Sequence, residues 1–260
     1  MNLINAVKTI YKELLIKDEP LKAYNLLKEL DLPELEREKN ISYKMVEHAF
    51  DEEIYQRNYG HHGEDQIPDA ESIEPISFVD HPEKRYDRYG WIMGELKNTS
   101  PKSYMDLACY VGTLPLAAAK MGIKATGVDM TMRAVEMAKE RNEKLGLNAE
   151  FFCDDITKFK GTTAELVSAF EVLEHVSDPK EFIKHLCDLS TGWVCVSTPN
   201  GPYGNGDGNL GGWNIPGYRG HLRVFTASSL RKLLEDCGCE IEFCEGMRDT
   251  LVWAKFRKKK

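Results

Sequence analysis

The stretch MDLACYVGTLPLAAAKMGIKATGVDM, residues 105–130, decides the fold of this chain. A short apolar strand ends at Asp106, a tight loop and a helix follow, and a second strand ends at Asp129. Such a unit suits a nucleoside, because the loop brings backbone N–H groups close to the ligand and the second acid can accept hydrogen bonds from both ribose hydroxyls. The sequence therefore predicts a nucleoside site on a strand–loop–helix–strand unit.

The spacing of the loop argues against a dinucleotide. A pyrophosphate-binding loop has the pattern G-x-G-x-x-G, whereas this loop runs Asp106-x-Ala108-x-Tyr110-x-Gly112, in the register D-x-G-x-G-x-G. That register resembles motif I of class I S-adenosylmethionine (SAM) methyltransferases. The family usually has glycine where this chain has Ala108 and Tyr110, and a Tyr cannot cheaply adopt the positive φ open to glycine. We therefore expect a loop conformation permitted to Tyr110; a degenerate loop that does not bind SAM is the alternative.

Four further segments resemble motifs of the same family, in the family's order. TGVDM (126–130) looks like the motif that follows motif I, and FFCDDI (151–156) looks like the segment whose Asp receives the adenine amino group. FEVLEHV (170–176) resembles motif IV, and STPN (197–200) resembles the end of the fifth strand. The resemblance covers roughly residues 100–260 and implies a Rossmann-like α/β sheet of seven strands with a terminal antiparallel hairpin.

The same resemblance implies a set of SAM-binding residues. Asp106 and Gly112 would flank the methionine moiety, and Asp129 would bind the ribose. Asp155 and the backbone of Ile156 would bind the adenine. The whole predicted SAM site comprises Asp106, Ala108, Tyr110, Gly112, Asp129, Met130, Asp154, Asp155, Ile156 and Phe170.

Regular alternation of apolar strands and helices from residue 103 onward predicts a parallel sheet with right-handed crossovers. The last two strands are joined only by Gly246-Met247-Arg248, which is too short for a parallel crossover, so they must form a hairpin. A helix is expected over residues 86–96. Strands are expected near 103–108, 124–129, 149–153, 165–171, 192–198, 239–245 and 249–256.

The chain divides into three parts. Residues 1–60 carry apolar side chains at helical spacing and are predicted to form a helical accessory or cap segment, which could bind a protein partner or a second copy of the chain. Residues 61–85 are polar and predict a linker or lid. Residues 86–260 form the predicted methyltransferase domain. Within it, residues 199–223 hold eight glycines and several aromatic residues, which indicates an active-site lid.

Composition restricts the partners of the chain. A net charge of −8 and a pI near 5.5 argue against broad electrostatic capture of nucleic acid. No apolar run approaches the length of a membrane-spanning helix, so no membrane partner is expected. Seven cysteines without a C-x-x-C pair are typical of free thiols in a reducing compartment, and we expect a cytoplasmic protein.

A second group of residues follows the fourth strand. If the chain turns helical there, Glu171, Glu174 and His175 project from one face and suit a divalent cation. With His221 as a fourth ligand, the set is similar to metal-dependent small-RNA terminal 2′-O-methyltransferases, which hold Mg²⁺ or Mn²⁺. The first three positions also resemble ubiquinone-pathway O-methyltransferases. The alternative is a site without metal, in which the His helps to close the SAM pocket.

The predicted reaction is methyl transfer from SAM to a hydroxyl of a small molecule or glycan. It requires near-attack geometry and the removal of one proton. Without metal, His221 or His175 is the predicted general base, because an imidazole titrates near physiological pH. Glu171 is the third predicted catalytic residue. Two other functions stay open: a nucleic-acid methyltransferase acting on a 2′-hydroxyl or a base, and a non-catalytic assembly module with a degenerate SAM site.

Overall fold

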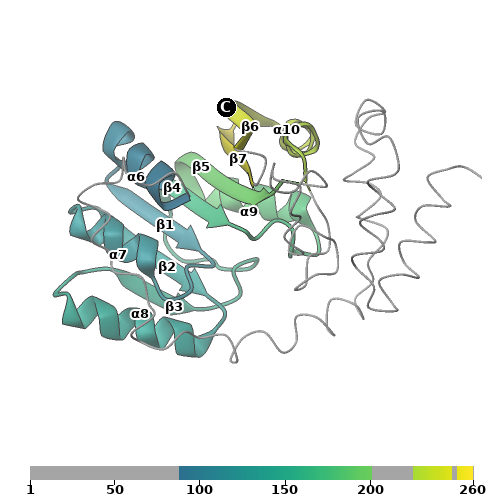
Figure 1. Cartoon of the computed structure of the whole chain (residues 1–260). Coiled ribbons are helices and arrows are strands. Elements are labelled where there is room, and N and C mark those ends of the chain that lie inside the picture. The colour runs from purple at the N-terminus through teal and green to yellow at the C-terminus, as the bar shows by residue number, and fades with distance from the viewer. Residues whose placement is uncertain (1–87, 201–224, 248–250, 260) are drawn as a thin grey trace, which may run out of the picture.

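The computed structural model describes residues 88–200, 225–247 and 251–259, which together hold one sheet of seven strands. The strands lie side by side in the order β3-β2-β1-β4-β5-β7-β6 (Figure 1). This arrangement confirms the predicted seven-stranded Rossmann-like fold. The strands are β1 (Ser103–Leu107), β2 (Lys124–Asp129), β3 (Glu150–Cys153), β4 (Ala164–Phe170), β5 (Ser190–Pro199), β6 (Cys239–Met247) and β7 (Leu251–Lys258).

Strand direction follows the predicted pattern. The neighbours within β3-β2-β1-β4-β5 all pair in parallel, while β7 pairs antiparallel with both β5 and β6. The predicted terminal hairpin is therefore confirmed. Strand order reverses between β1 and β4, which are neighbours in the sheet. In open α/β sheets, ligands bind outside the carboxyl ends of the strands at this reversal, so β1, β2 and β4 position the site.

Helices cover both faces of the sheet (Figure 1). Alternate strand residues point to opposite faces: Tyr104 and Leu166 pack in one apolar cluster, and their neighbours Met105 and Val167 pack in another. The first cluster includes side chains of α6, α7 and α8, and the second includes side chains of α9 and α10. The helices of the described residues are α6 (Arg88–Thr99), α7 (Thr113–Lys120), α8 (Met132–Lys144), α9 (Pro179–Leu189) and α10 (Ala227–Asp236).

The segment after β4 does not form the helix on which the predicted grouping of Glu171, Glu174 and His175 depends. Residues 171–178 form turns, and α9 begins only at Pro179. The Asp178 side chain caps that helix by accepting hydrogen bonds from the backbone N–H groups of Lys180 and Glu181. An Asp cap followed by Pro at the first helical position is a strong helix start, so the helix starts there and not at Glu171.

Several predicted segments lie outside the described residues. These are the helical segment 1–60, the linker 61–85 and nearly all of the lid 199–223, including His221. The helix expected over 86–96 is present from residue 88 onward as α6. Within the described ranges, none of the helices is long and apolar enough to cross a membrane.

Candidate functional site

The loop between β1 and α7 is tied to the end of β2. Asp129 closes β2, and its Oδ2 accepts a hydrogen bond of 2.8 Å from the backbone N–H of Tyr110. Its Oδ1 accepts a second, also of 2.8 Å, from the backbone N–H of Thr131. The backbone N–H of Cys109 donates to Val128 O at 3.1 Å. Asp129, the residue predicted to bind the ribose, therefore also fixes the loop that would surround the methionine moiety.

The loop keeps the backbone of a glycine loop despite its side chains. Ala108 has φ 62° and Tyr110 has φ 50°, both in the left-handed region. The expectation that Tyr110 avoids positive φ is therefore wrong. A left-handed non-glycine residue costs on the order of 1–3 kcal/mol, and here it aims the Tyr110 N–H at Asp129. The ring of Tyr110 packs against Val111, Ala134 and Met137, at the side of the loop that faces α8.

Glycine is retained where a side chain has no room. A Cβ on Gly112 would lie 2.6 Å from the ring of Phe151 and 2.8 Å from the Cβ of Ala138. A Cβ on Gly127 would lie 2.7 Å from Sγ of Cys109 and equally close to the Phe151 ring. Gly112 therefore lets the start of α7 pack against β3 and α8, and Gly127 lets β2 pack closely against the loop and β3.

Asp106 ends a buried hydrogen-bond chain. Tyr104 Oη and Ser168 Oγ lie 2.6 Å apart, and Ser168 Oγ donates to Asp106 Oδ1 at 2.5 Å. Burial raises the pKa of Asp106 to about 7, although the Ser168 hydrogen bond and the positive charge of Arg88 both lower it. Sequence reasoning missed Tyr104, Ser168 and Arg88. Motif I covers only β1 and the loop that follows it, whereas Ser168 lies on β4 and Arg88 on α6.

The Asp106 carboxyl predicts a pH dependence of stability. Its folded pKa lies above the unfolded value of 3.8, so the native state retains a proton that the unfolded chain has lost. Stability should therefore fall as pH rises through this interval. Between about pH 5 and pH 8, wild type should lose roughly 3 kcal/mol relative to Asp106→Asn, which has no such titration.

Urea unfolding of both proteins at the two pH values checks this prediction. The amide oxygen of the Asn can still accept from Ser168, so the variant tests the charge while keeping that contact. Parallel changes in wild type and variant would show that Asp106 does not bind this proton.

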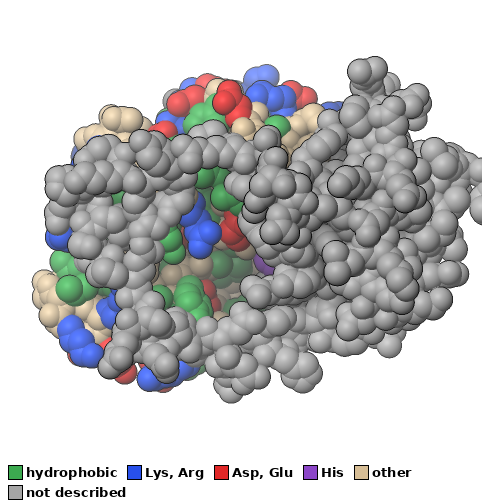
Figure 2. Space-filling view, viewed as in Figure 1, with side chains coloured by type: hydrophobic (Ala, Val, Ile, Leu, Met, Phe, Trp, Pro, Cys, Tyr) green, Lys and Arg blue, Asp and Glu red, His purple; other side chains and the backbone are tan. Residues whose placement is uncertain are grey.

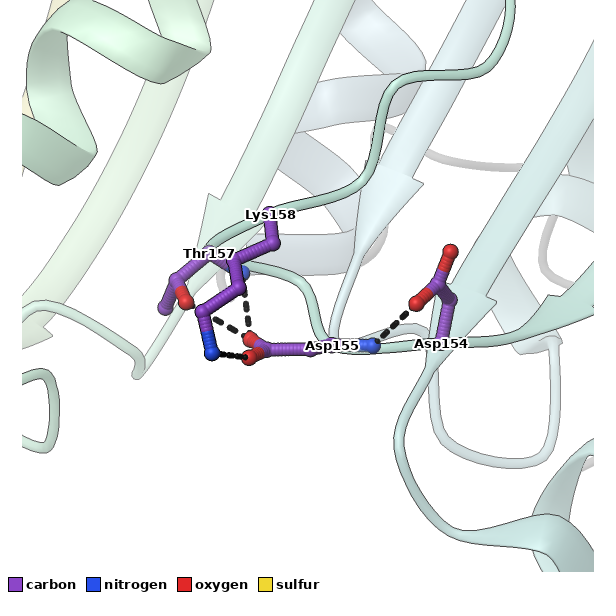
Figure 3. Close-up of polar contacts among 4 residues, drawn as sticks. All are labelled: Asp154, Asp155, Thr157 and Lys158. Atoms are coloured by element: carbon purple, nitrogen blue, oxygen red, sulfur yellow. Dashed lines mark hydrogen bonds and ion pairs between the residues drawn. The ribbon is translucent and has the colours of Figure 1, made fainter.

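The turn that holds Asp154 and Asp155 is fixed by hydrogen bonds among residues 154–158 (Figure 3). Asp155 Oδ1 accepts from the backbone N–H and the hydroxyl of Thr157, at 2.9 and 2.6 Å, and its Oδ2 accepts from Lys158 Nζ at 2.8 Å. These hydrogen bonds lower the pKa of Asp155 despite partial burial. The Asp154 carboxylate accepts from the backbone N–H of Asp155. An adenine amino group bound at Asp155 would share its carboxylate with Lys158.

Apolar side chains are exposed near the carboxyl ends of β2 and β3. Met130 is 65% exposed and Phe152, on β3, is 41% exposed. Large apolar groups in the open at the end of two neighbouring strands provide a surface against which a flat ring can pack. The sequence did not identify Phe152 as a site residue, because the resemblance of residues 151–156 assigns a role only to the acids and Ile156. The face in view in Figure 2 shows hydrophobic side chains with acidic and basic ones among them.

Glu171 and Glu174 bind to different faces of β5. Ser197 Oγ donates to Glu171 Oε1 at 2.6 Å, and Thr198 Oγ1 donates to Glu174 Oε2 at 3.0 Å. Ser197 and Thr198 are consecutive strand residues, so their side chains point to opposite faces of the sheet. The two carboxylates are therefore held apart by the strand.

This separation bears on the predicted metal site. His175 Nε2 lies 3.7 Å from Glu174 Oε1, but Glu171 is engaged on the other face. Among the described residues, no group of three or more His, Cys, Asp and Glu side chains could hold a metal ion. The convergence expected of Glu171, Glu174 and His175 required a helix that the chain does not form there. In the described part of the chain, these three side chains therefore do not converge on one position, and His221 lies outside it.

Glu171 retains the features of a functional acid. It has φ 57°, so it is a third strained residue at this edge of the sheet, with Ala108 and Tyr110. Burial raises the pKa of Glu171, while the Ser197 hydrogen bond and the positive charge of Arg88 oppose that rise. Strained backbone and a raised pKa at the end of β4 are typical of active-site residues.

Comparison with known proteins agrees with this geometry. A family model described as a methyltransferase domain matches residues 83–242. The chain belongs to this methyltransferase family. Its fold is that of the class I, SAM-dependent methyltransferases.

The relatives share parts of the chain. The ubiquinone biosynthesis O-methyltransferase of Coxiella burnetii is 37% identical over 91 residues, which cover 34% of this chain and 38% of the relative. The enzyme of the same name from Bordetella pertussis is 27% identical over 118 residues, covering 44% of this chain and 49% of the relative. The chain thus spans less than half the length of these curated relatives.

Solved structures show the same fold at low identity. The magnesium protoporphyrin IX methyltransferase of Synechocystis PCC 6803, with bound SAH, has a TM-score of 0.53 and 18% identity, covering 80% of this chain and 94% of that one. A SAM-dependent methyltransferase of Clostridium acetobutylicum has a TM-score of 0.54 and 13% identity, covering 70% and 96%.

Proposed function

We propose that this methyltransferase binds SAM at the carboxyl edge of β1, β2 and β4 and transfers its methyl group to a hydroxyl of a small molecule. One observation carries the proposal: the Asp129 carboxylate and the Ala108–Gly112 loop are joined by the Tyr110 hydrogen bond into one preformed cradle. The hydroxyl as acceptor is supported by the ubiquinone biosynthesis O-methyltransferases, to which the chain is similar. A net charge of −8 favours a small acceptor over a nucleic acid.

The cradle provides SAM with distinct contacts. Asp129 has two oxygens with about four lone pairs in total, and backbone N–H groups use two of them, so capacity remains for two ribose hydroxyls. Met130 and Phe152 offer apolar surface to the adenine, and Asp155 offers a carboxylate oxygen. Asp106, behind the loop, would face the methionine end. These residues bind and orient the donor, whose sulfonium group already activates the methyl for displacement.

Glu171 is the described residue best suited to remove the proton of the acceptor. It lies at the end of β4, next to the strand reversal, and its raised pKa brings it closer to the pH at which a general base works best. Glu171→Gln should lower kcat clearly while leaving SAM affinity almost unchanged. Glu174→Gln, at a buried carboxylate bonded to Thr198, is the matched comparison and should act through stability. Unchanged turnover in a folded Glu171→Gln protein would leave His175 or His221 as the base.

Transfer of a labelled methyl group tests the function directly. The full chain is incubated with methyl-labelled SAM and, separately, with phenols, sugars, RNA and DNA as acceptors. Label that enters an ether group of a small molecule is expected. Label in nucleic acid, with binding that weakens steeply with salt, would identify a nucleic-acid methyltransferase instead. Calorimetric titration that detects no SAM binding would identify a non-catalytic module.

A further inference from the structure

Two cysteines meet on the side of the domain away from the loop. Cys187 lies near the end of α9, and Cys239 is the first residue of β6, which is an edge strand of the sheet. Their Sγ atoms lie 3.9 Å apart, within hydrogen-bond distance for thiols. The residues are 52 positions apart in sequence, so the fold, and not local chain geometry, brings them together.

The surroundings favour reaction between these two thiols. Cys187 is 6% exposed, whereas Cys239 is partly exposed and offers a path from solvent. The hydrogen bond between them lowers the pKa of Cys187 and raises that of Cys239, because one S–H group stabilises the opposing thiolate. Lys258 also lowers the pKa of Cys187, while burial and Asp188 raise it.

A third thiol lies close by but is engaged elsewhere. Cys237 Sγ donates to Lys180 O at 3.8 Å, and burial raises the pKa of Cys237 to about 11. It is therefore mostly protonated near neutral pH and directed to a backbone carbonyl. Cys239, two residues later, is the one that faces Cys187.

We infer that Cys187 and Cys239 form an oxidation site, at which a hydroperoxide converts the two thiols into a disulfide between α9 and β6. One thiolate attacks the peroxide oxygen and becomes a sulfenic acid, and the O–O bond breaks to release hydroxide or alkoxide. The second sulfur then attacks the first, the S–O bond breaks, and water leaves. The two thiols lose two hydrogen atoms in total, and the peroxide is reduced to water or to an alcohol and water.

The two sulfur atoms must approach by about 2 Å from their separation of 3.9 Å to form a bond. A disulfide has an S–S distance of about 2 Å; Cys187 lies in the last turn of α9, and Cys239 is the first residue of β6. The cross-link would enclose β5 and α10 in a covalent loop. A loop of this length restricts the unfolded chain, so the oxidised protein should melt at a higher temperature than the reduced protein.

Thiol counting by mass spectrometry tests the inference without any methyl acceptor. The full chain is treated with hydrogen peroxide, unreacted thiols are alkylated, and the protein is weighed before and after reduction with dithiothreitol. Wild type should lose two thiols reversibly. Cys187→Ser and Cys239→Ser should each abolish this paired loss, and the matched control Cys237→Ser should retain it.

Specific results would overturn the inference. Loss of the disulfide in Cys237→Ser with its retention in Cys239→Ser would make Cys237 the partner of Cys187. Oxidation of wild type that proceeds only to sulfinic acid, or that leaves both thiols free, would exclude the pair. Thermal unfolding of oxidised and reduced wild type needs no variant, and identical midpoints would also count against the cross-link. None of these results depends on SAM binding.

Discussion

Asp129→Ala is expected to weaken SAM binding by about a hundredfold or more. Hydrogen bonds to a charged group contribute about 1.5–3 kcal/mol each, and two ribose hydroxyls would lose their acceptor together. The substitution also releases the Tyr110 and Thr131 N–H groups, so the loop loses its attachment to β2. The affinity is measured by calorimetric titration of wild type and variant with SAM.

Controls separate this effect from unfolding. Asp188→Ala removes an exposed acid that pairs with Lys258 on another part of the domain, and it should bind SAM as wild type does. Asp129→Asn retains one acceptor oxygen and should fall between wild type and Asp129→Ala. Thermal unfolding of each protein shows whether the fold is kept. A folded Asp129→Ala protein with wild-type affinity would place the nucleoside elsewhere.

Much of this site could be predicted because it depends on chain order. Asp106 is the next-to-last residue of β1 and Asp129 is the last residue of the neighbouring parallel strand β2, and strand order alone brings such ends to one edge of the sheet. The hairpin of β6 and β7 was equally accessible, since a connection of three residues allows no crossover. In both cases a local count of residues decides between a few possible topologies.

The Glu171–His175 segment shows where that reasoning stops. Spacing by three and four residues brings side chains together only on a helix, and Asp178 and Pro179 start the helix later. The hydroxyls of Ser197 and Thr198 then fix the two carboxylates on opposite faces. The face of the sheet on which the side chain of a turn residue lies depends on its hydrogen-bond partners from another strand. These partners cannot be identified from a single sequence.

Tyr110 illustrates a different limit. Intrinsic preference argues against positive φ for Tyr, yet the structure has it, because the hydrogen bond to Asp129 and the packing of the ring outweigh a cost of about 1–3 kcal/mol. A motif in which glycine is usual thus tolerates side chains at some positions. The positions that retain glycine here, Gly112 and Gly127, are those where a Cβ would overlap its neighbours.

Gly112→Ala should therefore destabilise the fold far more than Gly122→Ala. Both glycines have a similar left-handed backbone, with φ 76° and 81°, so Ala should cost about 1–2 kcal/mol at each through conformation alone. At Gly122 nothing lies within 4 Å of the added Cβ, whereas at Gly112 it would meet Phe151 and Ala138 at 2.6 and 2.8 Å. Overpacking of this kind adds about 1–3 kcal/mol. Urea unfolding of the two variants measures the difference.

Rescue by a second substitution identifies the overlap as the cause. Phe151→Leu in the Gly112→Ala background removes the ring atoms nearest to the new Cβ, so the double variant should lose less stability than the two single losses together. The Ala138 contact stays, so the rescue should be partial. Equal losses for Gly112→Ala and Gly122→Ala, or strict additivity with Phe151→Leu, would mean that backbone strain alone retains glycine at the start of α7.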